Sequence, residues 1–109
     1  EISAPAVTSL GLSQKEQPFL TVVVPAYNEH ERLGPTLARI ADYLGTQDYH
    51  WQVIVVSDGS TDGTNDLVKV LAESEPRITL LAYSPNQGKG AAVRTGFLAA
   101  HSEWVLLAR

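Results

Sequence analysis

The stretch that most constrains the fold is VIVVSDGSTDG, Val53 to Gly63, in which an unbroken apolar run ends in a carboxylate. Val53 to Val56 is β-branched throughout, without alternating polarity. This is the pattern of a strand covered on both faces, and therefore of a parallel sheet flanked by helices. In such sheets ligands bind beyond the carboxyl ends of the strands, so the pattern places Asp58 at a candidate ligand-binding edge.

Three further apolar runs predict three more strands, and the segments between them have helical spacing. The strands are expected over Phe19 to Val24, Ile78 to Tyr83 and Trp104 to Ala108. Strands and helices alternate with short connections, an order that favours right-handed parallel crossovers. The sequence therefore predicts an α/β fold, a Rossmann-like three-layer half with four parallel strands in the order 3-2-1-4 and helices on both faces.

Each expected helix carries an apolar stripe for one face of the sheet. Asn28 and Glu31 form a possible capping box, but Pro35 lacks the N–H of an interior position, so the first helix is expected to begin near Gly34. The third helix is expected over Ala91 to His101. The inward-facing residues are Leu33, Leu37, Ile40, Ala41 and Leu44 in the first helix, Leu67, Val68 and Leu71 in the second, and Ala92, Val93, Gly96, Phe97 and Ala100 in the third.

Length and composition limit the domain organisation and argue against several function classes. The 109 residues make one small domain, in which residues 1–18, rich in Ser, Pro and Ala, are expected to be a flexible leader and residues 19–109 the core. The net charge of −4, with eight dispersed basic residues, argues against a nucleic-acid partner. The chain has no cysteine for a disulfide or a thiolate metal site, and no apolar run long enough to span a bilayer.

Three polar clusters are expected at the same edge of the sheet. They are AYNE at 26–29, SDGSTD at 57–62 and NQGKGAAVR at 86–94. Each cluster has an ordinary structural explanation. Asp58 could form only an Asx turn with the residues after it, Asp62 could cap a helix, and Lys89 and Arg94 could lie on a solvated face.

The functional explanation of the same clusters is a nucleotide site. Gly88 and Gly90 at a helix start let backbone N–H groups approach an anion, and Arg94 follows Gly90 by one helical turn, an arrangement suited to a diphosphate. Asp58 is an acceptor-only group suited to a base N–H or a ribose hydroxyl, and the AYNE loop adds polar partners. Neither the G-x-G-x-x-G fingerprint after the first strand nor the P-loop is present, which excludes flavin, nicotinamide and Walker-type sites.

The chain contains, in this order, the segments TVVVPAYNE, ERLGPTLARIADYL, VIVVSDGSTDGT and NQGKGAAVRTGF. This series resembles the N-terminal half of family-2 glycosyltransferases, which are inverting enzymes of the GT-A fold. The resemblance covers Leu20 to Ala108 and looks closest to the dolichyl-phosphate or polyprenyl-phosphate glucosyltransferases. It implies transfer of a sugar from a nucleotide-sugar donor, UDP-glucose above all, to a lipid phosphate or another acceptor.

The resemblance also implies roles for single residues. The uridine pocket would be lined by Pro25, Ala26, Tyr27 and Glu29. Asp58 would bind the base or ribose, and Lys89 and Arg94 would lie beside the diphosphate, next to Gly88 at the expected helix start. Many relatives carry a paired acid after the second strand, where this chain has Ser57 before Asp58. In these enzymes Mg²⁺ or Mn²⁺ bridges the diphosphate through a D-x-D motif, which by its spacing from Trp104 would begin at position 109, occupied by Arg109. No metal ligand and no catalytic base is therefore expected within this chain.

Two hypotheses of different classes follow. In the first, the chain is the donor-binding part of a glycosyltransferase, truncated at its carboxyl end and inactive alone, from a protein that acts in the cytoplasm or at the cytoplasmic face of a membrane. In the second, it is a non-catalytic nucleotide-binding or self-associating module. In both, the last strand leaves a sheet edge and an apolar face exposed, which predicts a homo-oligomer.

Overall fold

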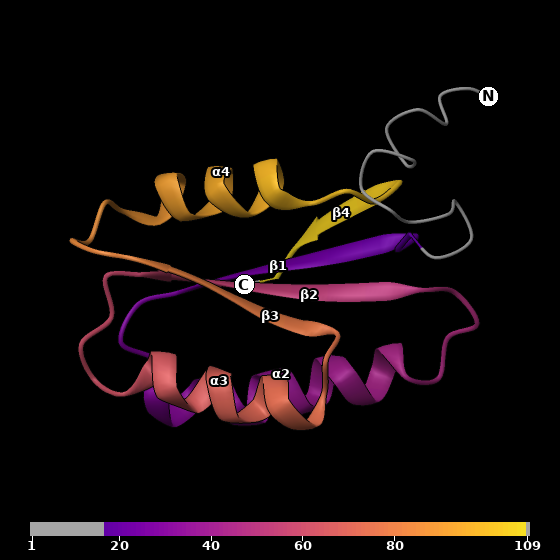
Figure 1. Cartoon of the computed structure of the whole chain (residues 1–109), viewed down its shortest axis with the longest axis horizontal. Coiled ribbons are helices and arrows are strands. Elements are labelled where there is room, and N and C mark those ends of the chain that lie inside the picture. Colours follow the sequence, from indigo (N-terminus) through magenta and orange to yellow (C-terminus); the bar gives the residue numbers. More distant parts are fainter. Residues whose placement is uncertain (1–16, 109) are drawn as a thin grey trace.

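The computed structural model describes residues 17–108, in which strands and helices alternate along the chain (Figure 1). The elements are β1 (Leu20–Ala26), α2 (His30–Leu44), β2 (Trp51–Asp58), α3 (Thr64–Ser74), β3 (Ile78–Tyr83), α4 (Lys89–Ala99) and β4 (Trp104–Leu107). All paired strands are parallel, in the order β3-β2-β1-β4 that the sequence predicts. The predicted leader, residues 1–18, lies outside the described residues except for its last two.

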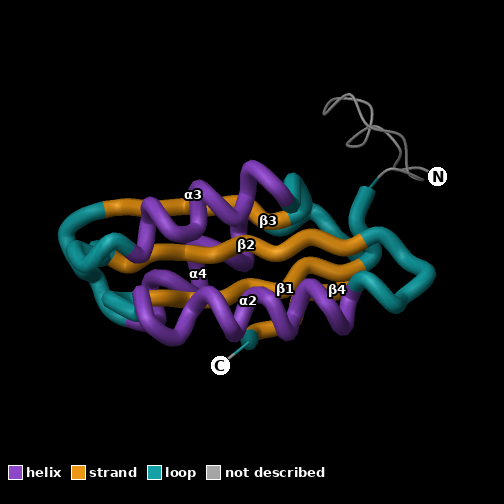
Figure 2. Tube along the Cα trace, turned by 90° about the horizontal axis from the view of Figure 1, so that it is seen from below, coloured by secondary structure: helices purple, strands orange, loops and turns teal. Residues whose placement is uncertain are grey.

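The sheet lies between two helical layers, with α4 on one face and α2 and α3 on the other (Figure 1). Figure 2 shows α2 and α3 running side by side across their face. Toward α2 and α3 the core contains Val22, Val24, Val53, Val55, Leu33, Leu37 and Val68, and toward α4 it contains Val23, Ile54, Val56 and Ala92. Successive residues of the two central strands thus point to opposite apolar faces, as the unbroken run of β2 predicts.

Small residues bring α4 close to the sheet. Ala92 and Gly96 are its buried residues, and a Cβ added at Gly96 would lie 2.3 Å from a methyl carbon of Val23. The helix runs over Lys89–Ala99, so it begins and ends two residues before the predicted range. The prediction that Phe97 faces inward was wrong. Its side chain is 43% exposed, because the close face of the helix admits only the small residues.

Strand β1 continues through Pro25, although the sequence predicts that Pro25 ends it. The Val23 carbonyl accepts the Ala108 N–H at 2.9 Å, so the polar backbone groups of Val23 face β4. Pro25, two residues later, faces the same side, but β4 pairs with β1 only as far as Val23. The missing N–H of Pro25 therefore removes no ladder hydrogen bond, and the strand runs on to Ala26.

Within residues 17–108, no helix combines the length and the apolar character that crossing a lipid bilayer requires.

Candidate functional site

A cavity of about 290 Å³ opens at the carboxyl ends of β1 and β2, beside the start of α4. Its lining residues are Pro25, Ala26, Tyr27, Glu29, Asp58, Asn86, Gly88, Lys89 and Ala92. Seven of the eight residues that the sequence singles out are in this lining, and they come from three chain segments distant in the sequence, at the ends of β1 and β2 and at the start of α4. The structure therefore brings the three polar clusters together at one edge of the sheet.

Arg94 is the residue that does not join them. It is exposed on α4, and the buried residues Ala92 and Gly96 lie two positions before and after it. Two positions correspond to about 200° of rotation around a helix, so Arg94 lies on the face turned away from the sheet. Arg94 is therefore not in the cavity lining beside Asp58, and the cation in that lining is Lys89.

Asp58 ends β2 with its side chain buried, and its carboxylate receives hydrogen bonds from the loop after β3. Oδ1 accepts the Gln87 N–H at 2.7 Å, while Oδ2 accepts the Gly88 N–H at 2.9 Å and the Asn86 side-chain amide at 2.8 Å. The alternative of an Asx turn with the residues directly after Asp58 is wrong, because its partners lie 28 to 30 positions along the chain. The carboxylate holds the loop that leads into α4.

The loops can meet this closely because residue 59 is glycine. Gly59 has φ of +76°, in the left-handed region that side chains with a Cβ rarely adopt. A Cβ at this position would lie 2.4 Å from the Asn86 backbone nitrogen. Both the backbone conformation and the contact with the neighbouring loop therefore require glycine immediately after Asp58.

The surroundings of Asp58 favour its ionised form. Burial raises the pKa of its carboxyl, but the nearby Tyr83 hydroxyl and the N–H groups of Gln87 and Gly88 outweigh burial, so the pKa lies below its usual range. The Tyr83 hydroxyl is buried beside this carboxylate without meeting ordinary hydrogen-bond geometry. Burial and the adjacent negative charge raise the pKa of Tyr83 to about 12. At neutral pH the site thus contains a carboxylate and a protonated phenol.

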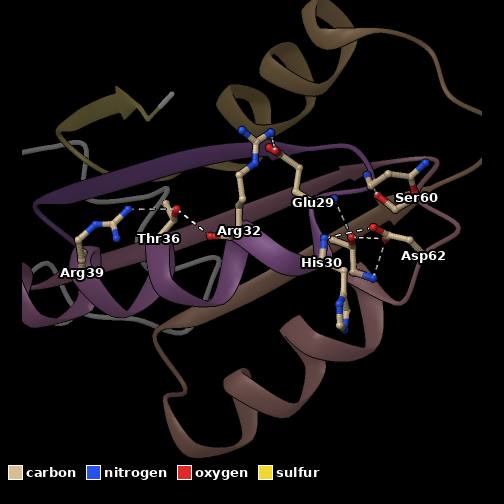
Figure 3. Close-up of polar contacts among 9 residues, drawn as sticks. Glu29, His30, Arg32, Thr36, Arg39, Ser60 and Asp62 are labelled. Atoms are coloured by element: carbon tan, nitrogen blue, oxygen red, sulfur yellow. Dashed lines mark hydrogen bonds and ion pairs between the residues drawn. The ribbon is translucent and has the colours of Figure 1, made fainter.

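The start of α2 is held by side chains of the loop between β2 and α3 and of Thr64, the first residue of α3 (Figure 3). Three successive backbone N–H groups donate to these side chains. Asn28 N–H donates to Ser60 Oγ at 3.0 Å. Glu29 N–H donates to Thr64 Oγ1 at 3.1 Å, and His30 N–H donates to Asp62 Oδ2 at 3.1 Å. These contacts give the AYNE loop a fixed position relative to the SDGSTD loop.

These contacts also explain why α2 begins at His30, four residues before the predicted start near Gly34. The predicted capping box is not formed, since Asn28 Oδ1 accepts the Thr61 N–H at 2.7 Å and Asn28 has φ of +50°. The acceptors come from another loop instead. Asp62, predicted as a cap of the second helix, accepts the N–H of Thr64 at 3.0 Å as well as that of His30.

The sequence model of the family described as Glycosyl transferase family 2 matches residues 21–108. This chain belongs to that family. The match covers nearly all of the residues that the structure describes, and it confirms the resemblance on which the sequence analysis relies.

Among the curated relatives of this family-2 chain are several dolichyl-phosphate beta-glucosyltransferases. That of Trichomonas vaginalis is 42% identical over 94 residues, covering 82% of this chain and 28% of the relative. The enzyme of Drosophila melanogaster is 37% identical over 109 residues, covering 94% of this chain and 33% of the relative. That of Homo sapiens is 32% identical over 96 residues, covering 82% and 30%. The chain thus spans about a third or less of the length of these relatives.

Solved structures with the same arrangement include S. aureus TarS 1-349, with a TM-score of 0.70 and 27% identity over 82% of this chain and 26% of that one. TarS 1-349 has also been solved in complex with UDP. The mannosyltransferase PcManGT from Pyrobaculum calidifontis, in complex with GDP-Man and Mn²⁺, has a TM-score of 0.60 and 36% identity over 78% of this chain and 25% of that one. These neighbours are GT-A glycosyltransferases, which confirms the predicted fold class.

Two features of this family-2 site were missed by the sequence analysis. Asn86 lines the cavity and donates to Asp58, and its place at the start of the NQGKG segment is the signal that could have indicated it. Thr64 is fully buried and accepts the Glu29 N–H. The sequence marks Thr64 only as a capping side chain of the following helix, and no local pattern reveals Glu29, which lies 35 positions earlier.

The acidic residues that line the cavity do not by themselves fit a divalent cation. The Asp58 carboxylate already accepts three protein donors, and the Glu29 carboxylate is paired with Arg32. Among residues 17–108 no group of three or more His, Cys, Asp or Glu side chains is placed to hold a metal ion. We therefore assign no metal ligand among the described residues.

Proposed function

We propose that the cavity binds the nucleoside diphosphate of a nucleotide sugar, and that the whole protein transfers the sugar to a lipid phosphate. The observation that carries this proposal is the meeting of three chain segments around one cavity, with the acceptor Asp58 and the cation Lys89 both in its lining. The names of the relatives support a glucosyl donor and a dolichyl-phosphate acceptor, and TarS with UDP supports a uridine nucleotide. The proposed donor is UDP-glucose.

The base and ribose are assigned to the Asp58 side of the cavity. An ionised carboxylate offers about four acceptor positions, and protein donors use three of those of Asp58, two of them on Oδ2. Oδ1 therefore keeps one position for the imide N–H of uracil or a ribose hydroxyl. Pro25 and Ala26 form the apolar wall, and Tyr27, 51% exposed, offers a ring on which a base can stack.

The diphosphate is assigned to the start of α4. The free N–H groups of a helix start attract anions, and Lys89 places a positive charge there. A Cβ added at Gly88 or Gly90 would meet no protein atom within 4 Å, so contacts within the protein do not require glycine at position 90. The open backbone leaves room for a phosphate group. Arg94 has no part in this assignment, because it lies on the outer face of the helix.

The cavity accounts for part of a nucleotide sugar. Pockets for small ligands usually enclose about 300–1,000 Å³, and about 290 Å³ lies at the lower limit. The sugar, the lipid phosphate and the catalytic base are therefore assigned to no described residue. A divalent cation, which a family neighbour holds as Mn²⁺, would neutralise the leaving diphosphate in the whole protein. A lipid acceptor would place this reaction at a membrane surface, and we propose its cytoplasmic face.

Calorimetric titration of the chain with UDP and GDP tests the proposal, with Asp58→Ala, Lys89→Ala and the control Arg94→Ala. We expect UDP to bind more tightly than GDP. Asp58→Ala and Lys89→Ala should each weaken UDP binding about tenfold or more, since each removes a charged partner of the ligand, and Arg94→Ala should leave it within about twofold. Unchanged UDP affinity in both test variants would show that the cavity is not the nucleotide site.

The alternative function, a non-catalytic nucleotide-binding or self-associating module, is separated from the first by a transfer assay on the whole protein. UDP-glucose and dolichyl phosphate should yield glucosylated lipid, and the 109-residue chain alone should yield none. Nucleotide binding without transfer by the whole protein would favour the alternative. Sugar transfer by the chain alone would contradict its assignment as the donor-binding part.

A further inference from the structure

Asp62 does not line the cavity, yet its carboxylate reaches the segment that forms one wall of it. Oδ2 accepts the His30 N–H at 3.1 Å, and Oδ1 accepts the Thr64 N–H at 3.0 Å and the Thr64 hydroxyl. One side chain thus joins the first residue of α2 to the first residue of α3. Figure 3 shows Asp62 beside the start of α2.

Thr64 extends this link by one residue. Its hydroxyl is fully buried, donates to Asp62 Oδ1 and accepts the Glu29 N–H at 3.1 Å. An ionised carboxylate can only accept, so the direction of the hydroxyl hydrogen is fixed, and the hydroxyl oxygen is left to receive the Glu29 N–H. Asp62 therefore holds two successive backbone groups, that of His30 directly and that of Glu29 through Thr64.

Glu29, one of the two residues held in this way, lines the cavity, and Tyr27, a second lining residue, lies two positions before it. Between them Asn28 adopts φ of +50°, a left-handed conformation that asparagine tolerates better than most residues with a Cβ. Contacts with Ser60 and Thr61 hold Asn28 from the other loop. The position of the cavity wall therefore depends on the 60–64 loop.

Resting on the proposed function, we propose that Asp62 is a positioning residue for nucleotide binding, which holds Glu29 and His30 so that Tyr27 and Glu29 face the nucleotide. Asp62 touches no ligand in this proposal. Hydrogen bonds from the Thr64 hydroxyl and from the backbone N–H groups of His30 and Thr64 lower the pKa of Asp62, although the partial loss of hydration of its carboxylate opposes them. The carboxylate is therefore ionised, and able to accept all of its donors, throughout the neutral range.

The test compares Asp62→Asn and Thr64→Val with two controls. Asp62→Asn replaces one accepting oxygen by an N–H₂ donor that faces backbone donors, and Thr64→Val removes the hydroxyl at nearly constant shape. Thr64→Ser keeps the hydroxyl and is the conservative rescue. Asp66→Asn removes the same charge from the first turn of α3, but from an exposed side chain outside the loop.

Amide hydrogen exchange of the ligand-free chain measures how well the hydrogen bonds of the Glu29 and His30 N–H groups are maintained. In Asp62→Asn the His30 amide should exchange about tenfold faster because its acceptor is altered, and the Glu29 amide should also exchange faster because the Thr64 hydroxyl that accepts from it loses the carboxylate that orients it. In Thr64→Val the Glu29 amide should exchange about tenfold faster because its acceptor is removed. Asp66→Asn and Thr64→Ser should exchange like the parent chain. Unchanged exchange in both test variants would overturn the proposal.

UDP titration reports the consequence for binding. Asp62→Asn and Thr64→Val should bind UDP about tenfold more weakly at a temperature where all variants are folded by circular dichroism, and the two controls should bind within about twofold of the parent. Faster exchange with unchanged UDP affinity would overturn the proposal, as would equal losses in Thr64→Ser and Thr64→Val. If the proposed function itself is wrong, the parent chain will not bind UDP at all, which distinguishes that outcome from a failure of the Asp62 proposal.

Discussion

The carboxylate of Asp58, the last residue of β2, accepts the backbone N–H of Gly88 at 2.9 Å, 30 positions later in the chain. Gly88 directly precedes α4, so this contact ties the end of one strand to the start of a helix on the adjacent face. The position of Lys89 relative to the cavity therefore depends on a charge supplied by another loop.

Replacing Asp58 by asparagine tests this dependence. The amide presents one accepting oxygen and two N–H donors where three protein donors now converge, so at least one contact becomes repulsive. The amides of Gln87 and Gly88 should exchange faster with solvent, and UDP affinity should fall about tenfold or more. Asp42→Asn, an exposed acid on α2, is the control. Parent-like protection of both amides in Asp58→Asn would contradict the role of the carboxylate.

The pH dependence of stability follows from the lowered pKa of Asp58. A depressed folded-state pKa gives stability that is present above the unfolded value, about 3.9, and is lost as the pH falls through the folded value. Urea midpoints of the parent and Asp58→Asn should therefore differ most near neutral pH and converge as the pH falls below about 4. A difference that stays constant down to about pH 2.5 would show that ionisation of Asp58 does not stabilise the fold.

Gly59→Ala should lower the free energy of unfolding by more than the addition of one methyl group usually does. The left-handed backbone costs about 1–2 kcal/mol with a Cβ present, and the approach to the Asn86 nitrogen adds strain, so a loss on the order of 2–4 kcal/mol in the free energy of unfolding is expected. Gly34→Ala is the control. It lies within α2, where a Cβ would make only ordinary contact with Leu67, and should stabilise by up to about 1 kcal/mol. Similar urea midpoints for the two variants would refute the argument.

The strands and their order could be predicted because the information is local. Unbroken apolar runs mark buried parallel strands, and Ile78 to Tyr83 has the same bounds in the sequence prediction and in the structure. Alternation with helices then leaves few topologies, of which 3-2-1-4 is the observed one. The convergence of Asp58 and Lys89 follows from the same rule, because the carboxyl ends of parallel strands share one edge.

The errors arose where partners are distant in the sequence or where a helix face had to be chosen. The start of α2 depends on Ser60, Asp62 and Thr64, and no pattern near His30 reveals these acceptors. Phe97 was predicted to face inward from helical spacing alone, and the structure exposes it. Arg94 was assigned to the diphosphate from its spacing to Gly90, and the structure leaves it outside the cavity lining. Ala92 and Gly96 mark the face of α4 that packs on the sheet by their small size, but only the structure shows how closely it approaches Val23.

Gly90→Ala should separate stability from binding. Alanine is favoured over glycine in a helix by up to about 1 kcal/mol, and a Cβ at this position meets no protein atom within 4 Å, so the thermal midpoint should rise or stay unchanged. UDP affinity should nevertheless fall, because the added methyl group occupies space assigned to the diphosphate. Calorimetric titration and thermal unfolding of the same sample measure both effects. An unchanged UDP affinity in Gly90→Ala would show that the diphosphate does not lie beside Gly90.

The outer edge of the sheet predicts self-association of the chain. Strand β4 pairs only with β1 among the described strands, and its Trp104 and Leu106 side chains are 61% and 56% exposed. Their registers with Leu20 and Val22 place both on the sheet face that carries α2 and α3. Unpaired backbone groups beside exposed apolar side chains form a ready surface for a second copy.

Light scattering at micromolar concentration should therefore report a mass above that of one chain. Replacing Trp104 and Leu106 together by lysine should give a monomer, because two charges on the pairing strand oppose both apolar contact and edge pairing. Leu98→Lys, which changes a side chain on α4 that is 75% exposed, should leave the assembly intact. A monomeric parent chain, or an assembly that survives the double substitution, would exclude β4 as the contact.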